Sequence, residues 1–185
     1  MEGSSFLNPA QALQGVKLRE GQSVADFGAG AGFFARAAAR EVGSEGEVWA
    51  VDGSGELLTR IKNLAVGEGL HNVQILRGTI DAKGGTALPS NHFDVVIAAN
   101  VLFGVEDKAG LAAEIYRVLK RTGRALIIDW TGSHGGLGPH ADHVILESAA
   151  RELFEQNGFT YAERTRAGAY HWGFVVRKSA GKAAQ

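Results

Sequence analysis

Short apolar runs alternate with helical patterns along almost the whole chain, and this alternation restricts the fold more than any other feature. Seven runs rich in branched, aromatic and other apolar residues predict strands at 23–27, 47–51, 73–76, 93–98, 125–128, 159–164 and 170–176. Five stretches predict helices at 9–16, 33–42, 55–66, 107–119 and 145–157. Strands that alternate with helices form a parallel sheet with helices on both faces.

The last two strand-like runs break this alternation. Only 165–169 lie between them, which is too short for a crossover helix, so the two runs must pair as an antiparallel hairpin. We therefore expect an α/β fold with a Rossmann-like, doubly wound, seven-stranded and mostly parallel sheet that ends in an antiparallel hairpin.

The length and composition fit one globular domain. A chain of 185 residues leaves little room for a second core, so we expect one domain over 1–178 and a disordered tail over the small, polar residues 179–185. The first five residues lack the basic and apolar regions of a signal peptide, and no apolar run is long enough to cross a membrane. These observations predict a cytoplasmic location.

Charge and cysteine content exclude several classes of function. The net charge of −1 argues against a nucleic-acid binder with a broad basic face, so we expect small-molecule partners. The chain has no cysteine, which excludes disulfides, thiolate zinc sites and cysteine nucleophiles.

Three glycines at alternating positions follow the first predicted strand. Asp26 lies at the carboxyl end of this strand, and Gly28, Gly30 and Gly32 follow it, directly before a helix. Glycine permits a tight turn and lets a ligand approach the amides at the helix N-terminus. The unit predicts a nucleotide-like ligand, although dinucleotide-binding folds use a related loop and a plain tight turn needs glycine too.

A second acidic residue, Asp52, ends the second predicted strand. A carboxylate at that position can accept hydrogen bonds from both hydroxyls of a ribose. The alternative is a solvated side chain at a strand end. Because the glycine loop precedes it, we favour the ribose role.

Further motifs accompany the loop and Asp52. They are VADFGAGAG at 24–32, VWAVD at 48–52, FDVV at 93–96, NVLF at 100–103 and VLKRTGR at 118–124. In this order they resemble the class I S-adenosylmethionine-dependent methyltransferases, especially the small-molecule type similar to the quinone and sterol methylases. The resemblance extends over about 16–176. It implies S-adenosylmethionine as cofactor and methyl transfer to an oxygen, nitrogen or carbon atom of a small molecule.

The resemblance also implies roles for individual positions. The residues expected to bind the cofactor are Asp26, Gly28, Ala29, Gly30, Gly32, Asp52, Gly53, Thr79, Ile80, Asn100 and Leu102. Asp26 would hold the amino group of the methionine moiety, and the glycines would surround its carboxylate. Thr79 and Ile80 would edge the adenine, while the backbone at Asn100 and Leu102 would face the methionine end and the acceptor.

Three positions depart from the family pattern. An acidic residue that binds the adenine amino group is common where Thr79 stands. In this sequence Asp81 is the nearest acid that could take its place. An apolar residue often follows the ribose acid and packs on adenine, which Gly53 cannot do. The usual Pro-Gly-Gly turn before the fifth strand is Arg121-Thr122-Gly123 here, a change in turn geometry rather than in chemistry.

The glycine-rich segment after the fifth predicted strand contains the candidate catalytic residues His134, His140 and His143. A histidine can accept the proton that an acceptor loses. Alternatives are that these histidines bind a metal together with Asp129 and Asp142, or that they are simply solvated. His171, in the last predicted strand, could line the pocket or fill the core. Phe6, Leu7 and Phe103 could close over the cofactor or provide ordinary packing.

Two other functions remain open. A nicotinamide-dependent oxidoreductase shares a glycine loop and a ribose acid, but Asp26 before the loop and the terminal hairpin argue against it. A module that binds S-adenosylmethionine or S-adenosylhomocysteine without catalysis is the other alternative, because the chain lacks the acceptor-side insertions of larger relatives.

Overall fold

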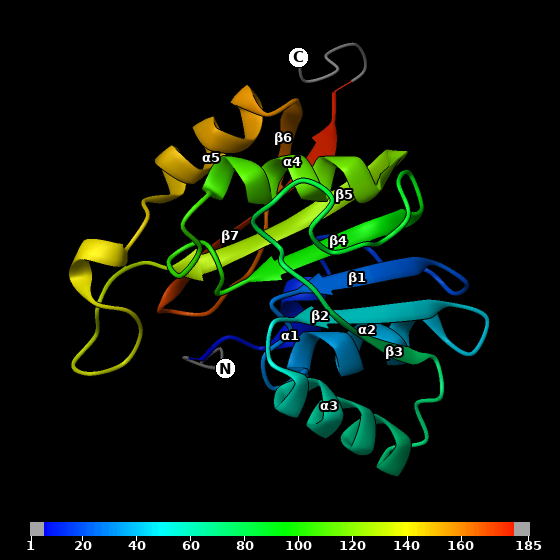
Figure 1. Cartoon of the computed structure of the whole chain (residues 1–185). Coiled ribbons are helices and arrows are strands. Elements are labelled where there is room, and N and C mark those ends of the chain that lie inside the picture. The colour runs from blue at the N-terminus through cyan, green and yellow to red at the C-terminus, as the bar shows by residue number, and fades with distance from the viewer. Residues whose placement is uncertain (1–5, 180–185) are drawn as a thin grey trace.

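The structure is a computed structural model that describes residues 6–179, and it contains one seven-stranded sheet. The strands are β1 (Ser23–Phe27), β2 (Glu47–Asp52), β3 (Val73–Arg77), β4 (Phe93–Ala99), β5 (Leu119–Trp130), β6 (Phe159–Arg164) and β7 (His171–Lys178). Their order across the sheet is β3-β2-β1-β4-β5-β7-β6 (Figure 1). Strands β1 to β5 pair in parallel, and β7 pairs antiparallel with both β5 and β6. The predicted fold class is confirmed.

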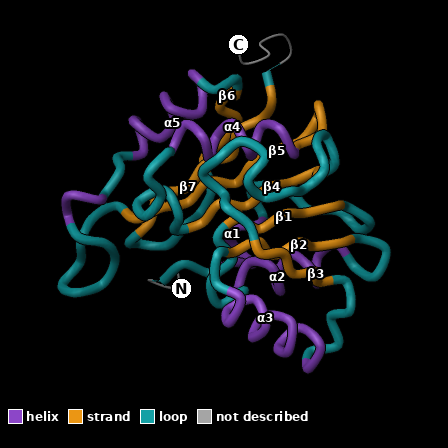
Figure 2. The backbone as a smooth tube through the Cα atoms, in the orientation of Figure 1, coloured by secondary structure: helices purple, strands orange, loops and turns teal. Residues whose placement is uncertain are grey.

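Helices cover both faces of the sheet, as Figure 2 shows. They are α1 (Pro9–Leu13), α2 (Phe33–Val42), α3 (Gly55–Gly67), α4 (Lys108–Val118) and α5 (Glu147–Gln156), with a short 3₁₀ turn, η1 (Ala141–His143). Buried residues of α1, α2 and α3 form one apolar cluster with one face of the sheet. Those of α4 and α5 form a second cluster with the other face. The three-layer arrangement directs the carboxyl ends of β1, β4 and β5 to one edge (Figure 1).

Side-chain caps explain where several helices begin. Asn8 accepts a hydrogen bond from the amide of Gln11, Ser54 from that of Leu57, and Asp107 from that of Gly110. Each cap satisfies an amide that the first helical turn leaves without a partner. The predicted starts of α1 and α4 follow from these capping residues.

The fifth strand differs from the prediction. It extends over 12 residues from Leu119 to Trp130 rather than over 125–128, and α4 ends one residue before it. Leu119 pairs with Phe93 and Arg124 with Val95, so the expected turn at 121–123 is an irregularity inside β5. Gly123 permits this course, because a Cβ there would lie 2.8 Å from the Leu119 side chain.

A buried acid holds the loop between β3 and β4. Glu114 accepts hydrogen bonds from the amide of Gly84 at 2.5 Å and from Arg117 Nη2 at 2.7 Å, and it also contacts the Thr86 hydroxyl. Burial alone would raise the pKa of Glu114, but the hydrogen bonds from Arg117 and Thr86 outweigh it and lower this pKa. The charged carboxylate therefore fixes the loop that follows β3.

Of the expected tail, 179–185, the structure describes only Ser179. Ser179 donates its amide to the Gly158 carbonyl at 2.9 Å, and its hydroxyl lies 2.8 Å from that of Thr160. The remaining part, 180–185, lies outside the described residues. Within 6–179, no helix is long and apolar enough to cross a membrane.

Candidate functional site

The glycine loop between β1 and α2 takes a conformation that requires glycine. Gly28 has φ +70°, and a Cβ there would lie 2.3 Å from Val101 Cγ1. Gly32 has φ +73° and would place a Cβ 2.7 Å from Ile61. Gly32 is also the N-cap of α2, which has no side-chain cap. The amides of Phe33 and Phe34 at the start of α2 are therefore available to an anionic ligand.

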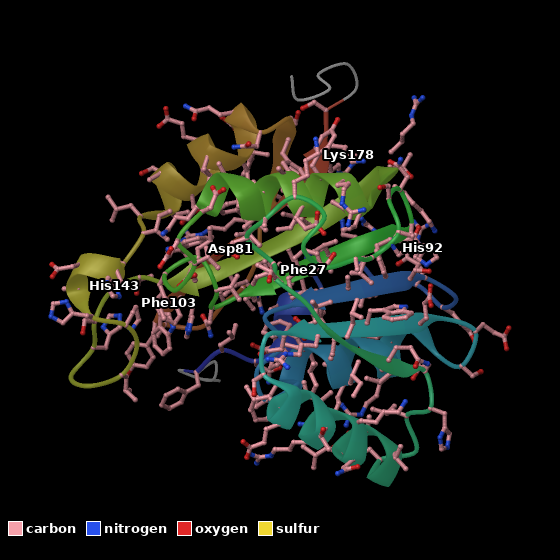
Figure 3. The ribbon with its side chains drawn as sticks, viewed as in Figure 1. Phe27, Asp81, His92, Phe103, His143 and Lys178 are labelled. Atoms are coloured by element: carbon pink, nitrogen blue, oxygen red, sulfur yellow. The ribbon has the colours of Figure 1, made fainter. Side chains whose placement is uncertain are left out.

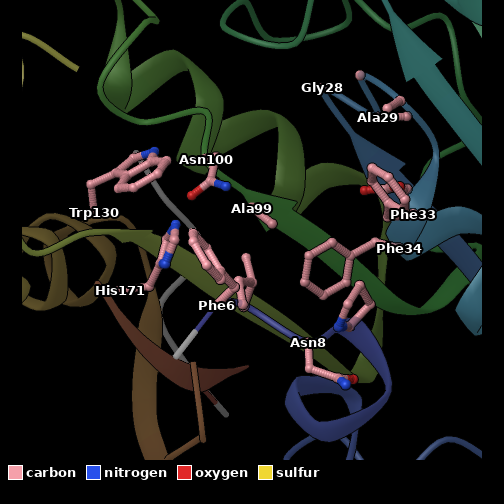
Figure 4. A pocket seen from close by; sticks show the side chains of 15 residues that line it. Phe6, Asn8, Gly28, Ala29, Phe33, Phe34, Ala99, Asn100, Trp130 and His171 are labelled. Atoms are coloured by element: carbon pink, nitrogen blue, oxygen red, sulfur yellow. The ribbon is translucent and has the colours of Figure 1, made fainter. Parts of the chain in front are cut away.

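A pocket of about 580 Å³ opens beside this loop, a volume that suits a small-molecule site. Figure 4 shows the pocket with its lining side chains. It is lined by Phe6, Leu7, Asn8, Pro9, Asp26, Gly28, Ala29, Gly30, Ala31, Phe33, Phe34, Ala99, Asn100, Trp130 and His171. The structure thus brings the glycine loop, the ends of β4 and β5, the start of β7 and the segment before α1 to one cavity.

Two polar side chains in this pocket have atoms without a protein partner. Oδ2 of Asp26 and Oδ1 of Asn100 are both buried and accept no hydrogen bond from the described residues. Asp26 is 2% exposed, and burial, followed by the nearby charge of Asp52, raises its pKa to about 7, against an opposing backbone amide at Ala35. Asn100 has φ +59°, a strained conformation that directs the chain away from β4. Buried polar atoms of this kind mark places where a ligand supplies the missing partner.

Asp52 lies behind the loop rather than in the lining of this pocket. Its Oδ2 accepts a hydrogen bond from the amide of Gly30 at 3.0 Å, and its Oδ1 accepts one from the amide of Ser54 at 2.9 Å. Gly53, next to it, is exposed, and its carbonyl accepts a hydrogen bond from Arg77 Nε at 3.0 Å. The carboxylate therefore stabilises the glycine loop and still has lone pairs for a ribose.

The remaining positions expected at the cofactor lie farther from the pocket. Thr79 is exposed, with its amide bonded to the Gly85 carbonyl at 3.0 Å. Ile80 packs close to Gly28, whereas the Leu102 side chain is 0% exposed in the core. None of the three lines the pocket in the described part of the chain.

The three candidate catalytic histidines are also outside the pocket lining within 6–179. His134 packs its ring 4.9 Å from that of Tyr170. His140 has a side chain that is 74% exposed, and its Nδ1 lies 3.2 Å from Asp142 Oδ2. His143 lies at the outer end of the loop after β5 (Figure 3). The structure does not bring these histidines together around one reacting atom.

The metal alternative has no support from the geometry. Within 6–179, no group of three or more His, Asp or Glu side chains is close enough to hold a metal ion. Asp129, one of the residues considered for it, is buried and accepts hydrogen bonds from the amides of Trp130 at 2.8 Å and Phe103 at 3.3 Å. Burial raises the pKa of Asp129 to about 6. Its carboxylate joins the end of β5 to the loop after β4.

The segment before α1 forms one wall of the pocket. The ring of Phe6 lies 5.7 Å from that of Tyr170. A Cβ on Gly168, in the β6–β7 loop, would lie 2.9 Å from the Phe6 backbone. Of the residues considered for closing over the cofactor, Phe6 and Leu7 line the pocket and Phe103 does not.

Several lining residues were not singled out from the sequence. Phe33 and Phe34 open α2 directly after the glycine loop, and Phe33 is 63% exposed. An exposed aromatic side chain beside a ligand loop is a usable signal for a binding surface. Trp130 had a comparable signal, since it ends the fifth strand at the ligand edge of the sheet.

Comparison with known proteins identifies the family. The family model described as a methyltransferase domain matches residues 25–127 of this chain. The chain belongs to this family. It is thus a class I S-adenosylmethionine-dependent methyltransferase domain by sequence, as its motifs predicted, and S-adenosylmethionine is its cofactor. The nicotinamide-dependent alternative is not favoured.

The methyltransferase domain is similar to a curated relative in sequence and to two solved structures in fold. It is 32% identical over 114 residues to the ubiquinone/menaquinone biosynthesis C-methyltransferase UbiE of Neisseria meningitidis, a match that covers 62% of this chain and 45% of UbiE. A SAM-dependent methyltransferase from Aquifex aeolicus superposes with a TM-score of 0.83 at 27% identity, over 93% of this chain and 90% of that one. The cyclase SpnF shares the fold alone, with a TM-score of 0.77 at 18% identity, over 94% of this chain and 81% of SpnF.

These comparisons also limit what passes from relatives to this methyltransferase domain. The chain spans about half the length of the curated relatives it matches. The family match ends at residue 127, so Phe6, Trp130 and His171 lie outside it. One wall of the pocket must therefore be interpreted from its own chemistry.

Proposed function

We propose that this protein transfers the methyl group of S-adenosylmethionine to a small-molecule acceptor. The observation that carries the proposal is the continuity of the pocket, which reaches from Asp26 and the glycine loop to Trp130 and His171. A methyl donor on one side and an acceptor on the other would then share one cavity. Such positioning of two reactants is the main contribution that methyl transfer needs from a protein.

The residues of the loop suit the methionine end of the cofactor. The unpartnered oxygen of Asp26 matches an ammonium group, and the uncapped amides of α2 match a carboxylate. We assign the backbone of Gly28, Ala29, Gly30 and Gly32 to the space around that carboxylate. Asn100 then faces the sulfur side.

The nucleoside side of the proposed cofactor site lies at the ends of β2 and β3. Asp52, with Gly53 beside it, is our proposed partner for the ribose hydroxyls. Ile80 and Thr79 are proposed for the adenine edge, whereas the backbone at Leu102, like that at Asn100, is proposed for the methionine end and the acceptor. The exposure of Thr79 and Gly53 predicts an adenine that stays partly open to solvent.

Methyl transfer requires that the two reactants are held in position and that water is excluded from the site. When bound, the cofactor supplies a methyl group on a positively charged sulfur that needs no further activation. The protein holds the acceptor in line with that methyl group and excludes water with the aromatic side chains of Phe6, Phe33, Phe34 and Trp130. A proton-accepting side chain near the acceptor would assist an acceptor that loses a proton.

Binding and turnover test the proposal separately. Calorimetric titration with S-adenosylhomocysteine should show one site, and a coupled assay for its release should detect turnover with at least one member of a panel of phenols, amines, carboxylates and activated carbons. Mass spectrometry of the product gives the methylated atom, which decides between carbon methylation, as in the name of UbiE, and heteroatom methylation.

The matched variants are Asp26→Asn and Asp142→Asn. Asp142 is an exposed acid outside the pocket lining. We expect the first change alone to weaken S-adenosylhomocysteine binding. Tight binding without turnover on any acceptor would favour the non-catalytic module, and a response to nicotinamide cofactors in place of S-adenosylhomocysteine would reject the proposal. A cytoplasmic location and the single-domain boundary at 178 remain predictions.

A further inference from the structure

His171 is a buried side chain in the pocket with no partner for either ring nitrogen. It is 7% exposed, and neither Nδ1 nor Nε2 makes a hydrogen bond to the described residues. It opens β7, where it pairs directly with Trp130 at the end of β5, and the two rings lie 4.1 Å apart. Two orphaned nitrogens on one buried ring are rare in a folded core. They indicate that a ligand provides the missing partner.

The surroundings keep this imidazole uncharged. Burial, followed by the nearby charge of His134, lowers the pKa of His171 to about 4. At neutral pH the ring therefore has one N–H donor and one acceptor nitrogen. An acceptor nitrogen in an apolar site suits a hydroxyl group, which can donate a hydrogen bond without carrying charge.

The rest of this end of the pocket has the same character. Among the described lining residues, the titratable groups are Asp26 and His171, and no lysine or arginine is present. The described lining residues offer no cationic side chain to an acceptor carboxylate, and Asp26 is already assigned to the cofactor. Burying an unpaired charge is costly. The aromatic face of Trp130 favours a flat, apolar body.

We propose that His171 and Trp130 form the acceptor subsite, in which a ring nitrogen of His171 accepts a hydrogen bond from the hydroxyl group of an uncharged, flat acceptor of the phenol class. The subsite rests on the proposed function, because it names the acceptor of that reaction. His134, His140 and His143 have no part in it.

A side chain that covers His171 must move for this contact to form, and we infer that it is Phe6. Both ring nitrogens of His171 are buried. Phe6 lines the same pocket as His171, in the same part of the view in Figure 4, and it is 56% exposed. A rotation of this side chain toward solvent opens the approach to His171. The acceptor then binds beside Trp130, whose ring lies 4.1 Å from that of His171.

The proton balance is simple for transfer to the hydroxyl oxygen. As the bond from oxygen to the methyl carbon forms, the carbon–sulfur bond breaks and sulfur keeps its electron pair. The hydroxyl proton moves to the free nitrogen of His171, because the acidity of the hydroxyl group rises sharply as the oxygen loses electron density. His171 releases this proton to solvent after the product leaves, since its burial disfavours the charged ring.

The first experiment measures binding to the protein loaded with S-adenosylhomocysteine. The probes are p-cresol, toluene, benzoate and benzylamine, which share one ring and differ in the polar group. We expect p-cresol to bind tightest. In His171→Phe, which keeps a ring and removes both nitrogens, p-cresol should bind roughly tenfold more weakly, about the free energy of one hydrogen bond, while toluene changes less than about twofold.

Two further variants separate hydrogen bonding from packing. His171→Gln retains an acceptor atom and should recover most of the p-cresol affinity. His143→Phe, at an exposed site outside the pocket, should leave all four affinities unchanged. The affinity of each variant for S-adenosylhomocysteine reports whether it is folded. If the changes at His171 prevent folding, the order of the four probes on the unaltered protein still decides.

The outcomes distinguish this subsite from the proposed function. Equal losses of p-cresol and toluene in His171→Phe, or benzoate binding as tightly as p-cresol, would overturn the subsite. Turnover confined to amines or carboxylates would overturn the subsite and leave the methyltransferase proposal intact. Selective p-cresol binding without methylation of any acceptor would support the subsite and reject the proposed function.

Discussion

Oδ2 of Asp52 accepts a hydrogen bond from the amide of Gly30 at 3.0 Å, which joins the end of β2 to the middle of the glycine loop. The same carboxylate accepts a hydrogen bond from the amide of Ser54, the N-cap residue of α3. A side chain proposed for the ribose thus also holds the loop proposed for the methionine moiety. The Asp52 carboxylate therefore connects the ribose side of the proposed cofactor site to its methionine side.

Replacement of Asp52 by alanine should therefore affect both stability and binding. We expect Asp52→Ala to lower the unfolding free energy by about 1–2 kcal/mol, because two backbone amides lose their acceptor. S-adenosylhomocysteine should bind roughly thirtyfold more weakly, or worse, as the ribose hydroxyls lose a charged acceptor. Calorimetry and urea unfolding measure the two effects. Glu56→Ala, an exposed acid in the first turn of α3, is the control, and equal affinities in the two variants would remove the ribose assignment.

The raised pKa of Asp26 predicts that cofactor binding depends on pH. Below about pH 7 the buried carboxyl of the free protein holds a proton, which an ammonium group must displace. S-adenosylhomocysteine affinity should fall by up to about tenfold per pH unit below this pKa and level off above it. Asp26→Asn should bind weakly at pH 8 with a flat profile. The same slope in both proteins would contradict the assignment.

The same carboxyl gives a stability effect of defined sign. Because the folded-state pKa of Asp26 lies above the unfolded value of 3.8, folding favours the protonated form, and stability falls as the pH rises from about 4 through 7. A rise of the pKa to about 7 corresponds to about 4 kcal/mol. At pH 8, ligand-free Asp26→Asn should consequently be more stable than the unaltered protein, and the difference should vanish near pH 4. Chemical unfolding across this range measures it.

Gly138 supports Trp130 from the loop after β5. Its φ is +85°, and a Cβ would lie 2.8 Å from Cε3 of the indole. Gly138→Ala should cost about 1–3 kcal/mol through backbone strain and displacement of the ring. Gly132→Ala is the matched control, because its Cβ would be 3.5 Å from the nearest side chain, that of His134, and its φ is not positive. Thermal unfolding and indole fluorescence should differ between the two variants. Identical behaviour would show that the loop accommodates the added methyl group at Gly138 without strain.

Two arginines face each other across β5 and β7. Arg124 pairs in register with Arg177, and burial together with the charges of Arg177 and Arg19 lowers the pKa of Arg124. Like charges at directly opposite strand positions are destabilising. Arg177→Gln should therefore raise the unfolding free energy by up to about 1 kcal/mol at low salt, and less at high salt. Arg166→Gln, at an exposed position in the β6–β7 loop, should show no such gain.

The cofactor half of the molecule was largely predictable from local patterns. The alternation of runs and the short spacer at 165–169 determine a parallel sheet with a closing hairpin, and β1, α2 and β6 have the predicted bounds. The glycine loop follows from its residues because each positive φ is a local requirement. Local chemistry and topology agree over this part of the chain.

The acceptor half was less predictable, for physical reasons. A loop with several glycines has no preferred course, so nothing in the spacing of His134, His140 and His143 indicates which side chain reaches the pocket. His171 begins a strand in which six successive residues are buried, 171–176. Such a pattern does not distinguish a pocket wall from a core. The irregularity in β5 also depends on pairing with Phe93, a contact distant in sequence.

The segment at Phe6 has a consequence for how this domain diversifies. It packs on Gly168 near the far end of the chain, and with Trp130 and His171 it builds a wall outside the 25–127 match. On the proposed assignment, selection for a new acceptor can act on residues outside 25–127 without disturbing the half that holds the methyl donor. One donor-binding frame can in this way serve a succession of acceptors through changes in the segments that flank it.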